Sequence, residues 1–348
     1  MANRMYRIGI VGASSLAGKE LSDELGESLL AMSDVVLLDD EDVAGQVTTA
    51  GDEPTFIQQI EESSFERMDF VFFAGGTEVT KRHWQNARRA GASIVDLTYA
   101  LEREKDVLVR APWVAEEFEL KMPPAPDLKT PAVVAAHPVT VMLALAMMRL
   151  QAKLPVASVA ATVMEPASEH GRAAMDELHQ QTVNLLSFQS LPREQYDAQV
   201  SFNLLPALGE SARISLEKTE QRIRSQYVSI SSGLLPTLAL QIVQAPVFHG
   251  YVISALVDFV QPTSVADVEA ALSGDHIDLV REDSEPPSNL SAAGQENIMV
   301  RVSGESNGGK PGTRFWLWLA ADNLKLGALN AIACASELRR LRPLGKVQ

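Results

Sequence analysis

The sequence predicts a two-domain α/β protein, in which a Rossmann-like, doubly wound parallel sheet is joined to an α+β domain. Three observations lead to this prediction. Short apolar segments alternate with helical patterns up to residue 136, longer strand patterns follow Pro138, and a helical pattern returns near the end. Strands that alternate with helices are typical of a parallel sheet covered on both faces. We therefore expect residues 1–136 with 322–348 to form the first domain and residues 137–321 to form the second.

The first domain is expected to contain short apolar strands, because runs of this kind suit strands buried on both faces. Helices are expected after the first strand and at 78–90, and a last helix at 323–340 is expected to return to this domain. The predicted strands are 6–11, 35–38, 70–73, 92–96, 107–109 and 133–136.

The second domain is expected to be built on a largely antiparallel sheet. Strands are predicted at 156–163, 224–230 and 252–260, with helices at 171–186 and 264–271 between them. The segment 281–296 is polar and rich in Pro, Ser and Gly, which predicts a surface loop.

Composition excludes several classes of function. A formal net charge of −15 repels phosphate backbones, so we expect no nucleic-acid partner. The single cysteine, Cys334, cannot form an internal disulfide, and the six histidines are scattered, so no metal site is expected. The longest apolar stretch, 139–148, is too short to span a bilayer. The N-terminus enters a strand without a leader pattern, which favours a cytoplasmic protein with no membrane partner.

The turn 12–18 follows a strand and opens a helix, as a nucleotide-binding loop does. Gly12 permits the tight turn, Gly18 lets the helix pack on the sheet, and the helix N-terminus offers N–H groups to a phosphate. Ser15, however, replaces the middle glycine that would let a pyrophosphate approach. The alternative is a turn retained only because the corner between strand and helix requires it.

An acidic run, Asp39 to Asp42, follows the second predicted strand. An acidic side chain at this place accepts a hydrogen bond from the ribose of NAD and repels the extra phosphate of NADP. If a dinucleotide binds, NAD is therefore favoured and NADP disfavoured. A solvated acidic loop is the alternative interpretation.

Several segments together resemble the aspartate-semialdehyde dehydrogenase family over nearly the whole chain. The resemblance rests on the order and spacing of these motifs: GASSLAG at 12–18, AGGT at 74–77, IVDLTYALE at 94–102, PASEHGRAAMDEL at 166–178, FNLLP at 202–206 and DNLKLGALNA at 322–331. It implies an NAD(P)-dependent oxidoreductase fold of amino-acid biosynthesis and a homodimer assembled through the second, substrate-binding domain. Together with the loop, it assigns cofactor binding to Gly12, Ser14, Ser15, Leu16, Gly18, Asp39, Gly75, Gly76 and Asn323.

In the family a cysteine thiolate attacks the aldehyde or acyl carbon. The segment AAHPVTV at 135–141 matches the family's cysteine motif and has Val139 at the cysteine position. Thr140 is adjacent, but a threonine hydroxyl is far less nucleophilic than a thiolate. Cys334 lies among alanines and Ile332 in the last predicted helix and is interpreted as a small core residue.

The family's catalytic histidine and one of its arginines are also replaced. Gln244 stands at the arginine position and Tyr251 at the histidine position, in the segment QAPVFHGYV at 244–252. His249 lies two residues before Tyr251, at a different reach, and is not expected to serve as the base.

The remaining anion-binding positions are changed as well. Glu102 stands at the phosphate-binding arginine position and reverses its charge, and Glu165 stands where the family has an active-site glutamine. Arg213 and Ser215 fall near the family's Glu and Lys contacts. The former active-site positions Val139, Glu102, Glu165, Gln244 and Tyr251 are expected to converge in space.

These losses resemble the Usg paralogues of the family, which lack the catalytic cysteine, and they leave no residue assigned to catalysis. Three functions remain open. The first is a non-catalytic homodimer that acts as a scaffold or binds a partner. The second is a sensor that binds a nucleotide or metabolite without turnover. The third is an NAD-dependent oxidoreductase that reduces an aldehyde or carbonyl without a thioester, with Tyr251, Thr140 and His137 lining its pocket. The sequence names neither the physiological ligand nor the protein partner.

Overall fold

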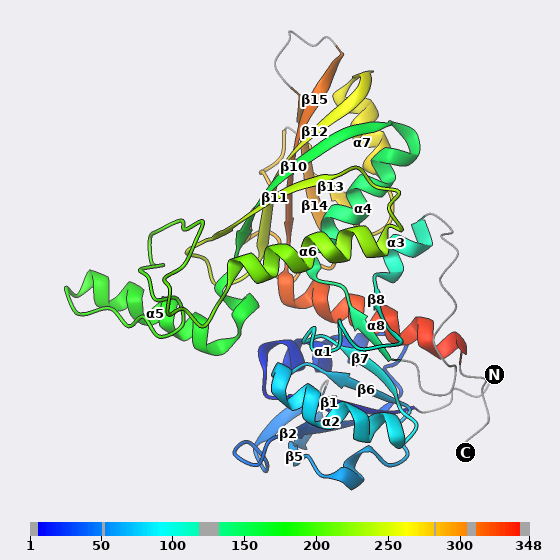
Figure 1. The fold of residues 1–348 in the computed structure, drawn as a ribbon, viewed down its shortest axis with the longest axis vertical. Coiled ribbons are helices and arrows are strands. Elements are labelled where there is room, and N and C mark those ends of the chain that lie inside the picture. The colour runs from blue at the N-terminus through cyan, green and yellow to red at the C-terminus, as the bar shows by residue number, and fades with distance from the viewer. Residues whose placement is uncertain (1–5, 51–52, 118–131, 282, 305–310, 342–348) are drawn as a thin grey trace. The chain divides into compact units, whose positions relative to one another are not determined.

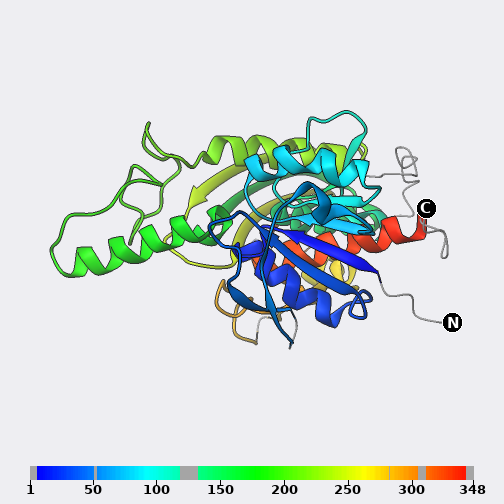
Figure 2. The same ribbon diagram turned by 90° about the horizontal axis from the view of Figure 1, so that it is seen from below.

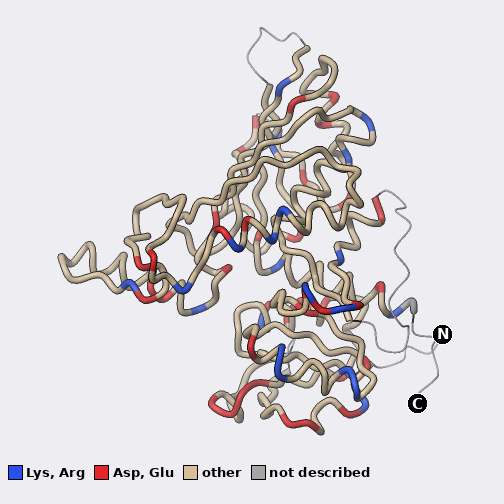
Figure 3. The backbone as a smooth tube through the Cα atoms, viewed as in Figure 1, with Lys and Arg blue, Asp and Glu red and all other residues tan. Residues whose placement is uncertain are grey.

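The computed structural model describes residues 6–50, 53–117, 132–281, 283–304 and 311–341 of the chain. It separates into two compact units (Figure 1). Unit 1 comprises Met1–Ala136 and Gly327–Gln348, and unit 2 comprises His137–Leu326. Among the described residues, no helix is both long and apolar enough to cross a membrane. Acidic and basic residues occur along the chain in both units (Figure 3).

Unit 1 is built on a seven-stranded sheet with the order β5-β2-β1-β6-β7-β9-β8. Every neighbouring pair in this sheet is parallel, as the short apolar runs predict. The strands are β1 (Arg7–Val11), β2 (Asp34–Asp39), β5 (Gln58–Gln59), β6 (Phe70–Phe73), β7 (Ser93–Asp96), β8 (Val107–Arg110) and β9 (Ala132–Ala135). A small hairpin, β3 (Val47–Ala50) with β4 (Glu53–Phe56), lies outside the sheet.

Helices cover both faces of this sheet. On one face, α1 (Leu16–Glu27) and the last part of α8 (Asn323–Leu341) pack in one apolar cluster with Ile8 and Ile10 of β1. On the other face, α2 (Thr77–Arg89) contributes Trp84 and Ala87 to a second cluster. A 3₁₀ turn, η1 (Glu62–Phe65), and the short helix α3 (Pro112–Glu117) complete the unit. The doubly wound architecture and the return of the C-terminal helix follow the sequence prediction.

Unit 2 is built on a six-stranded mixed sheet with the order β11-β10-β12-β15-β14-β13. Its central pairs β10–β12, β12–β15 and β14–β15 are antiparallel, whereas β10–β11 and β13–β14 are parallel. The strands are β10 (Val156–Glu165), β11 (Leu238–Gln244), β12 (Tyr251–Thr263), β13 (Ile277–Leu279), β14 (Ile298–Gly304) and β15 (Gly312–Ala321).

The helices α4 (Pro138–Lys153), α6 (Leu216–Ile230) and α7 (Val265–Leu272) pack against the sheet and one another. A 3₁₀ turn, η2 (Ala167–His170), leads into α5 (Arg172–Leu186). Helix α5 and the segment after it extend away from the sheet of the unit (Figures 1 and 2). Buried Gln181 anchors this segment, because its amide oxygen accepts from the backbone N–H groups of Val200 and Ser201.

Two details of the second domain differ from the sequence prediction. Residues 224–230 are not a strand but the end of helix α6. Ser215 caps this helix by accepting from Lys218 N–H, and Ile223 and Tyr227 are buried at helical spacing. Helix α4 was not predicted, because residues 138–150 are buried all round and therefore lack an amphipathic period.

Candidate functional site

The carboxyl ends of β1 and β6 hold two glycines in close contact. Gly12 has φ +83°, and a Cβ there would lie 2.2 Å from the Cα of Gly75. The strand order reverses between β1 and β6, so this edge is the topological switch point, where doubly wound sheets bind ligands. Gly76 caps the N-terminus of α2, and a Cβ there would meet nothing within 4 Å.

The backbone N–H groups of the turn 12–18 are largely satisfied inside the unit. Five donate to internal acceptors: Gly12 and Ala13 to Leu38 O (2.9 and 3.2 Å), Ser14 to Asp39 Oδ2 (2.8 Å), Ser15 to Gly12 O (3.0 Å) and Gly18 to Ser15 Oγ (2.9 Å). Leu16 and Ala17 open α1, where no helical carbonyl precedes them. Their N–H groups are the donors that a phosphate could contact.

Asp39 ends β2 as a buried carboxylate whose two oxygens accept from the N–H groups of Ser14 and Asp40. Each carboxylate oxygen keeps a second lone pair, so hydrogen bonding to a ribose hydroxyl is still possible. Asp40 forms an exposed ion pair with Arg82 at 3.9 Å. The Rossmann turn and its acidic neighbour therefore lie together in unit 1.

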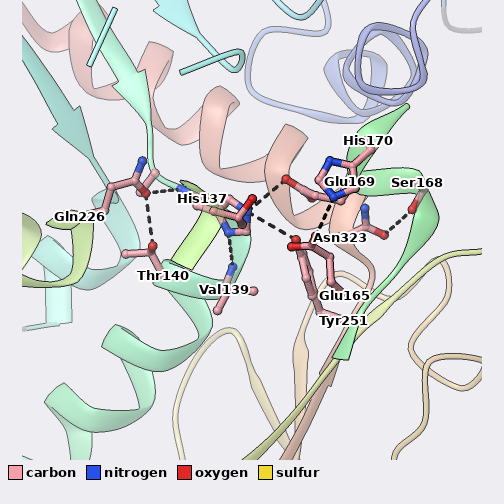
Figure 4. Close-up of polar contacts among 12 residues, drawn as sticks. His137, Val139, Thr140, Glu165, Ser168, Glu169, His170, Gln226, Tyr251 and Asn323 are labelled. Carbon is pink, nitrogen blue, oxygen red and sulfur yellow. Dashed lines mark hydrogen bonds and ion pairs between the residues drawn. The ribbon is translucent and has the colours of Figure 1, made fainter. Parts of the chain in front are cut away.

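In unit 2 a buried polar cluster surrounds the N-terminus of α4 (Figure 4). His137 caps the helix, and its Nδ1 accepts from the N–H of Val139 at 3.2 Å. The N–H of His137 donates to Gln226 Oε1 at 2.7 Å, and the Thr140 hydroxyl donates to the same oxygen at 3.2 Å. All four residues are buried. The helix start is thus capped by the protein's own side chains.

The other ring nitrogen of His137 faces an acid. Because Nδ1 accepts a hydrogen bond, Nε2 carries the proton and donates to Glu169 Oε1 at 3.0 Å. The hydroxyl of Tyr251 lies 3.4 Å from the same Nε2 and also bonds Glu169. Burial raises the pKa of Glu169, but His137, His170 and Tyr251 lower it, and the net pKa lies below its ordinary value.

A second acid–imidazole pair lies beside the first (Figure 4). Glu165 ends β10, and its Oε1 lies 2.6 Å from His170 Nε2. Burial lowers the pKa of His170, but the charges of Glu165 and Glu169 raise it, and the net pKa lies above its ordinary value. Glu165 is fully buried, and its Oε2 has no partner among the described residues.

Gln244 ends β11 directly beside Glu165, its register partner in the parallel pair. Its amide nitrogen donates to Glu165 O at 3.0 Å and to Ala245 O at 3.1 Å. Its Oε1, like Glu165 Oε2, is buried without a partner in the described part of the chain.

Four of the former active-site positions named from the sequence belong to unit 2, and one belongs to unit 1. Val139, Glu165, Gln244 and Tyr251 are linked through the hydrogen bonds and strand pairs described above, by way of His137 and Glu169. Glu102 is half-buried in unit 1. Burial is the largest cause that raises the pKa of Asp96, and the charge of Glu102 raises it further.

The other residues named from the sequence lie apart from this cluster or have structural roles. Arg213 is exposed, with its N–H donating to Gln195 O, and Ser215 caps α6. His249 is half-buried before β12. Asn323 opens α8, where its Oδ1 accepts from Ser168 and Gly250, and its Nδ2 is buried without a partner among the described residues.

Cys334 is fully buried in the α8 cluster of unit 1. Its Sγ lies 3.7 Å from the carbonyl oxygen of Arg110. Burial, and secondarily the charge of Glu337, raise the pKa of this thiol far above its ordinary value. A thiolate is therefore strongly disfavoured at this position.

Sequence reasoning missed Glu169 and Gln226 and gave His170 no role. Glu169 and His170 follow Glu165 within one short turn. An acid and a histidine directly after a predicted buried strand could have indicated a functional site. Gln226 could not be found in this way, because it comes from α6, distant in sequence, and was assigned to a strand.

Comparison with known proteins agrees with this fold. Residues 7–121 match the NAD-binding domain of the semialdehyde dehydrogenases, and residues 147–326 match their dimerisation domain. A USG-1 protein homolog from Pseudomonas aeruginosa is 29% identical over 93% of this chain and 95% of its own length. The aspartate-semialdehyde dehydrogenase of Rickettsia bellii is 24% identical over 96% of this chain and 98% of its own.

Solved structures give the same result. A probable aspartate-semialdehyde dehydrogenase from Pseudomonas aeruginosa superposes with a TM-score of 0.84 at 26% identity, covering 97% of this chain and 99% of its own. Aspartate semialdehyde dehydrogenase II from Vibrio cholerae gives the same TM-score and coverage at 22% identity.

Proposed function

The chain belongs to the semialdehyde dehydrogenase family, and from this premise we propose that it is a Usg-type member that does not catalyse the family's thiol-dependent reaction. We infer instead a homodimer that acts as a scaffold or binds a ligand without turnover. The similarity to the USG-1 protein homologs supports the subgroup.

The observation that carries this proposal is the position of the only thiol. Val139, at the family's cysteine position, is an apolar side chain with 0% exposure. It lies at the N-terminus of α4, where its backbone N–H donates to His137 Nδ1. The single cysteine of the chain, Cys334, is buried in the core of unit 1. A thioester needs a thiolate that reaches substrate, and these environments oppose one.

The homodimer is supported by the sheet face of unit 2 that lies opposite its helices. Exposed apolar side chains occur there on two neighbouring strands, Val260 on β12 and Trp316 and Trp318 on β15. Leu256 pairs with Trp316 on this same face. Contiguous exposed apolar surface of this kind marks interaction sites. The match of residues 147–326 to a dimerisation domain supports a second copy as the partner.

Nucleotide binding is proposed for unit 1, with NAD preferred over NADP. The family match includes an NAD-binding domain, and the N–H groups of Leu16 and Ala17 can donate hydrogen bonds to a phosphate. The buried carboxylate of Asp39 favours a ribose hydroxyl and opposes a 2′-phosphate. Ser15, which has its hydroxyl bonded to Ala74 O, leaves less room for the pyrophosphate than a glycine would.

The test is a calorimetric titration of the purified protein with NAD and NADP, followed by an assay with aspartate semialdehyde and phosphate on the same sample. We expect no turnover, whether or not NAD binds. Binding of NAD without turnover would support a sensor, whereas neither binding nor turnover would support a scaffold. Phosphate-dependent reduction of either cofactor would overturn the proposal.

A second candidate function rests on Tyr251. Its hydroxyl bonds Glu169 and lies near His137, so a proton donor backed by an imidazole and a carboxylate is present. A group of this kind could protonate a carbonyl during direct hydride transfer from NADH, without a thioester. Reduction of an aldehyde by NADH that Tyr251→Phe abolishes would favour this function over the first.

A further inference from the structure

The strongest unused feature of unit 2 is a pair of buried oxygens that have no hydrogen-bond partner among the described residues. They are Oε2 of Glu165 and Oε1 of Gln244. Both side chains have 0% exposure. Leaving one such acceptor unsatisfied is unfavourable, and more so for a charged group. We therefore expect these two oxygens to accept hydrogen bonds from a donor outside the protein chain.

The two oxygens belong to one site because the strands place the side chains together. Glu165 and Gln244 are register partners at the ends of the parallel strands β10 and β11. Partners in register point to the same face of a sheet. Each is a buried position that follows a less buried one in its strand, so both side chains project from the buried face of the sheet.

The orientation of the glutamine amide is fixed by its neighbours. Its nitrogen donates to two backbone carbonyls, Glu165 O and Ala245 O. Exchanging the amide nitrogen and oxygen would set an oxygen against both carbonyls, which is repulsive. The free group of Gln244 is consequently an acceptor, as is the free oxygen of Glu165.

The free oxygen of Glu165 belongs to a carboxylate. Glu165 pairs with His170, and Glu169 accepts its hydrogen bond from His137. The charge of Arg222, which is half-buried on α6, also acts on His170. A carboxylate oxygen favours a positively charged donor over a neutral one.

We propose that Glu165 and Gln244 form a subsite for a cationic donor, the primary ammonium group of a small ligand. An ammonium carries several N–H donors and a positive charge, so it can donate to both oxygens and pair with the carboxylate of Glu165. A carboxylate ligand is disfavoured here, because it would face two acceptors. This inference rests on the proposed function, because it names the class of ligand that a site without thiol chemistry would bind.

The experiment uses two probes of equal length and opposite charge, propylammonium and propionate. Each is titrated into the full-length protein by calorimetry at matched ionic strength, and contact is checked by saturation-transfer NMR. A fragment of this size is expected to bind with a Kd of about 1–10 mM. We expect propylammonium to bind and propionate to bind at least about tenfold more weakly.

Two variants locate the effect. Glu165→Gln removes the charge with little change in shape, and we expect it to weaken propylammonium binding about tenfold. Glu217→Gln makes the same charge change at an exposed position of α6 and should leave the affinity unaltered. Circular dichroism of both variants checks folding. If Glu165→Gln does not fold, Gln244→Met takes its place and should weaken binding several-fold. This change removes the neutral acceptor together with the amide donor to Glu165 O and Ala245 O, and its folding is checked in the same way.

Three results would overturn the inference. They are equal or tighter binding of propionate, propylammonium affinity that survives Glu165→Gln or its replacement, and no binding of either probe up to about 50 mM. The last result would mean that water alone satisfies the two oxygens. None of these results bears on turnover of aspartate semialdehyde, so failure of this inference is distinct from failure of the proposed function.

Discussion

At the scale of single residues, Gly12 shows most clearly how local chemistry determines this fold. It combines a left-handed φ of +83° with a backbone contact to Gly75 that leaves no space for a Cβ. The tight turn was predicted from the sequence. The contact with Gly75 could not be predicted, because it depends on the pairing of β1 with β6, whose partner residues are 62 positions apart in the sequence.

We expect Gly12→Ala to destabilise unit 1 by more than about 2 kcal/mol, because it adds both backbone strain and a steric clash. Gly45→Ala is the matched control, since Gly45 has φ +85° and nothing within 4 Å of its Cβ position. The control should cost only about 1 kcal/mol. Urea unfolding, followed by the intrinsic fluorescence of the four tryptophans, measures both. Equal costs for the two variants would contradict the close contact.

Cys334 offers a direct test of burial at one residue. Its raised pKa and 0% exposure predict that the thiol reacts with a disulfide reagent only when the protein opens. We expect one thiol per chain to react rapidly in denaturant and slowly in the native protein. Release of a coloured thiolate follows both reactions. Rapid stoichiometric reaction of the native protein would show that the thiol is accessible.

At the scale of elements, two acid–imidazole pairs, Glu169 with His137 and Glu165 with His170, connect the turn Ala167–His170 to α4 and β10. The pKa of His170 is raised, so its stabilisation is complete below its unfolded value of 6.5 and is lost as the pH rises through the folded pKa. The pKa of Glu169 is lowered, so its stabilisation is complete above its unfolded value of 4.5 and is lost as the pH falls through the folded pKa.

The two contributions are therefore complete together between pH 4.5 and 6.5. We expect His170→Gln to remove the loss of stability above this range and to leave the loss below it. Thermal unfolding of the wild type and the variant across pH measures the difference. A variant that keeps the alkaline loss would show that His170 is not its source.

The secondary structure shows where sequence patterns are informative. The strands of unit 1 were predicted because uninterrupted apolar runs such as 70–73 end at glycines. Helix α4 was missed because burial on every side removes the periodicity on which such predictions depend. Residues 224–230 were taken for a strand because their few apolar residues suit either element, and only the cap at Ser215 reveals the helix.

The candidate site was only partly predictable for a related reason. The family resemblance predicts changed positions at Val139, Glu165, Gln244 and Tyr251. They gave no hint that His137 caps α4 and pairs with Glu169, since such contacts are determined by packing and not by spacing along the chain. The side chains of this cluster thus bond one another, whereas Glu165 Oε2 and Gln244 Oε1 have no partner among the described residues.

At the scale of the whole molecule, the exposed sheet face of unit 2 predicts the oligomeric state. We expect Trp316→Glu to shift the protein from dimer to monomer, because it places a charge in the centre of an apolar interface. Leu29→Glu is the control, since Leu29 is an exposed apolar residue of unit 1. Light scattering after gel filtration gives both masses. A monomeric wild type, or a dimeric Trp316→Glu, would argue against this interface.

The whole molecule keeps the fold of the semialdehyde dehydrogenase family, and we propose that the groups that perform the family's chemistry are replaced. Both domain matches and the solved relatives cover nearly the entire chain. Folds of this kind support many functions, so conservation of architecture does not imply conservation of activity.

The most direct test of the central claim is a steady-state assay of aspartate semialdehyde oxidation with phosphate and either NAD or NADP. The wild type is compared with Cys334→Ser, and a catalytically active relative serves as the positive control. We predict no cofactor reduction above background by either form of this protein. Phosphate-dependent turnover by the wild type would contradict the claim, and its loss in Cys334→Ser would identify the buried thiol as the nucleophile.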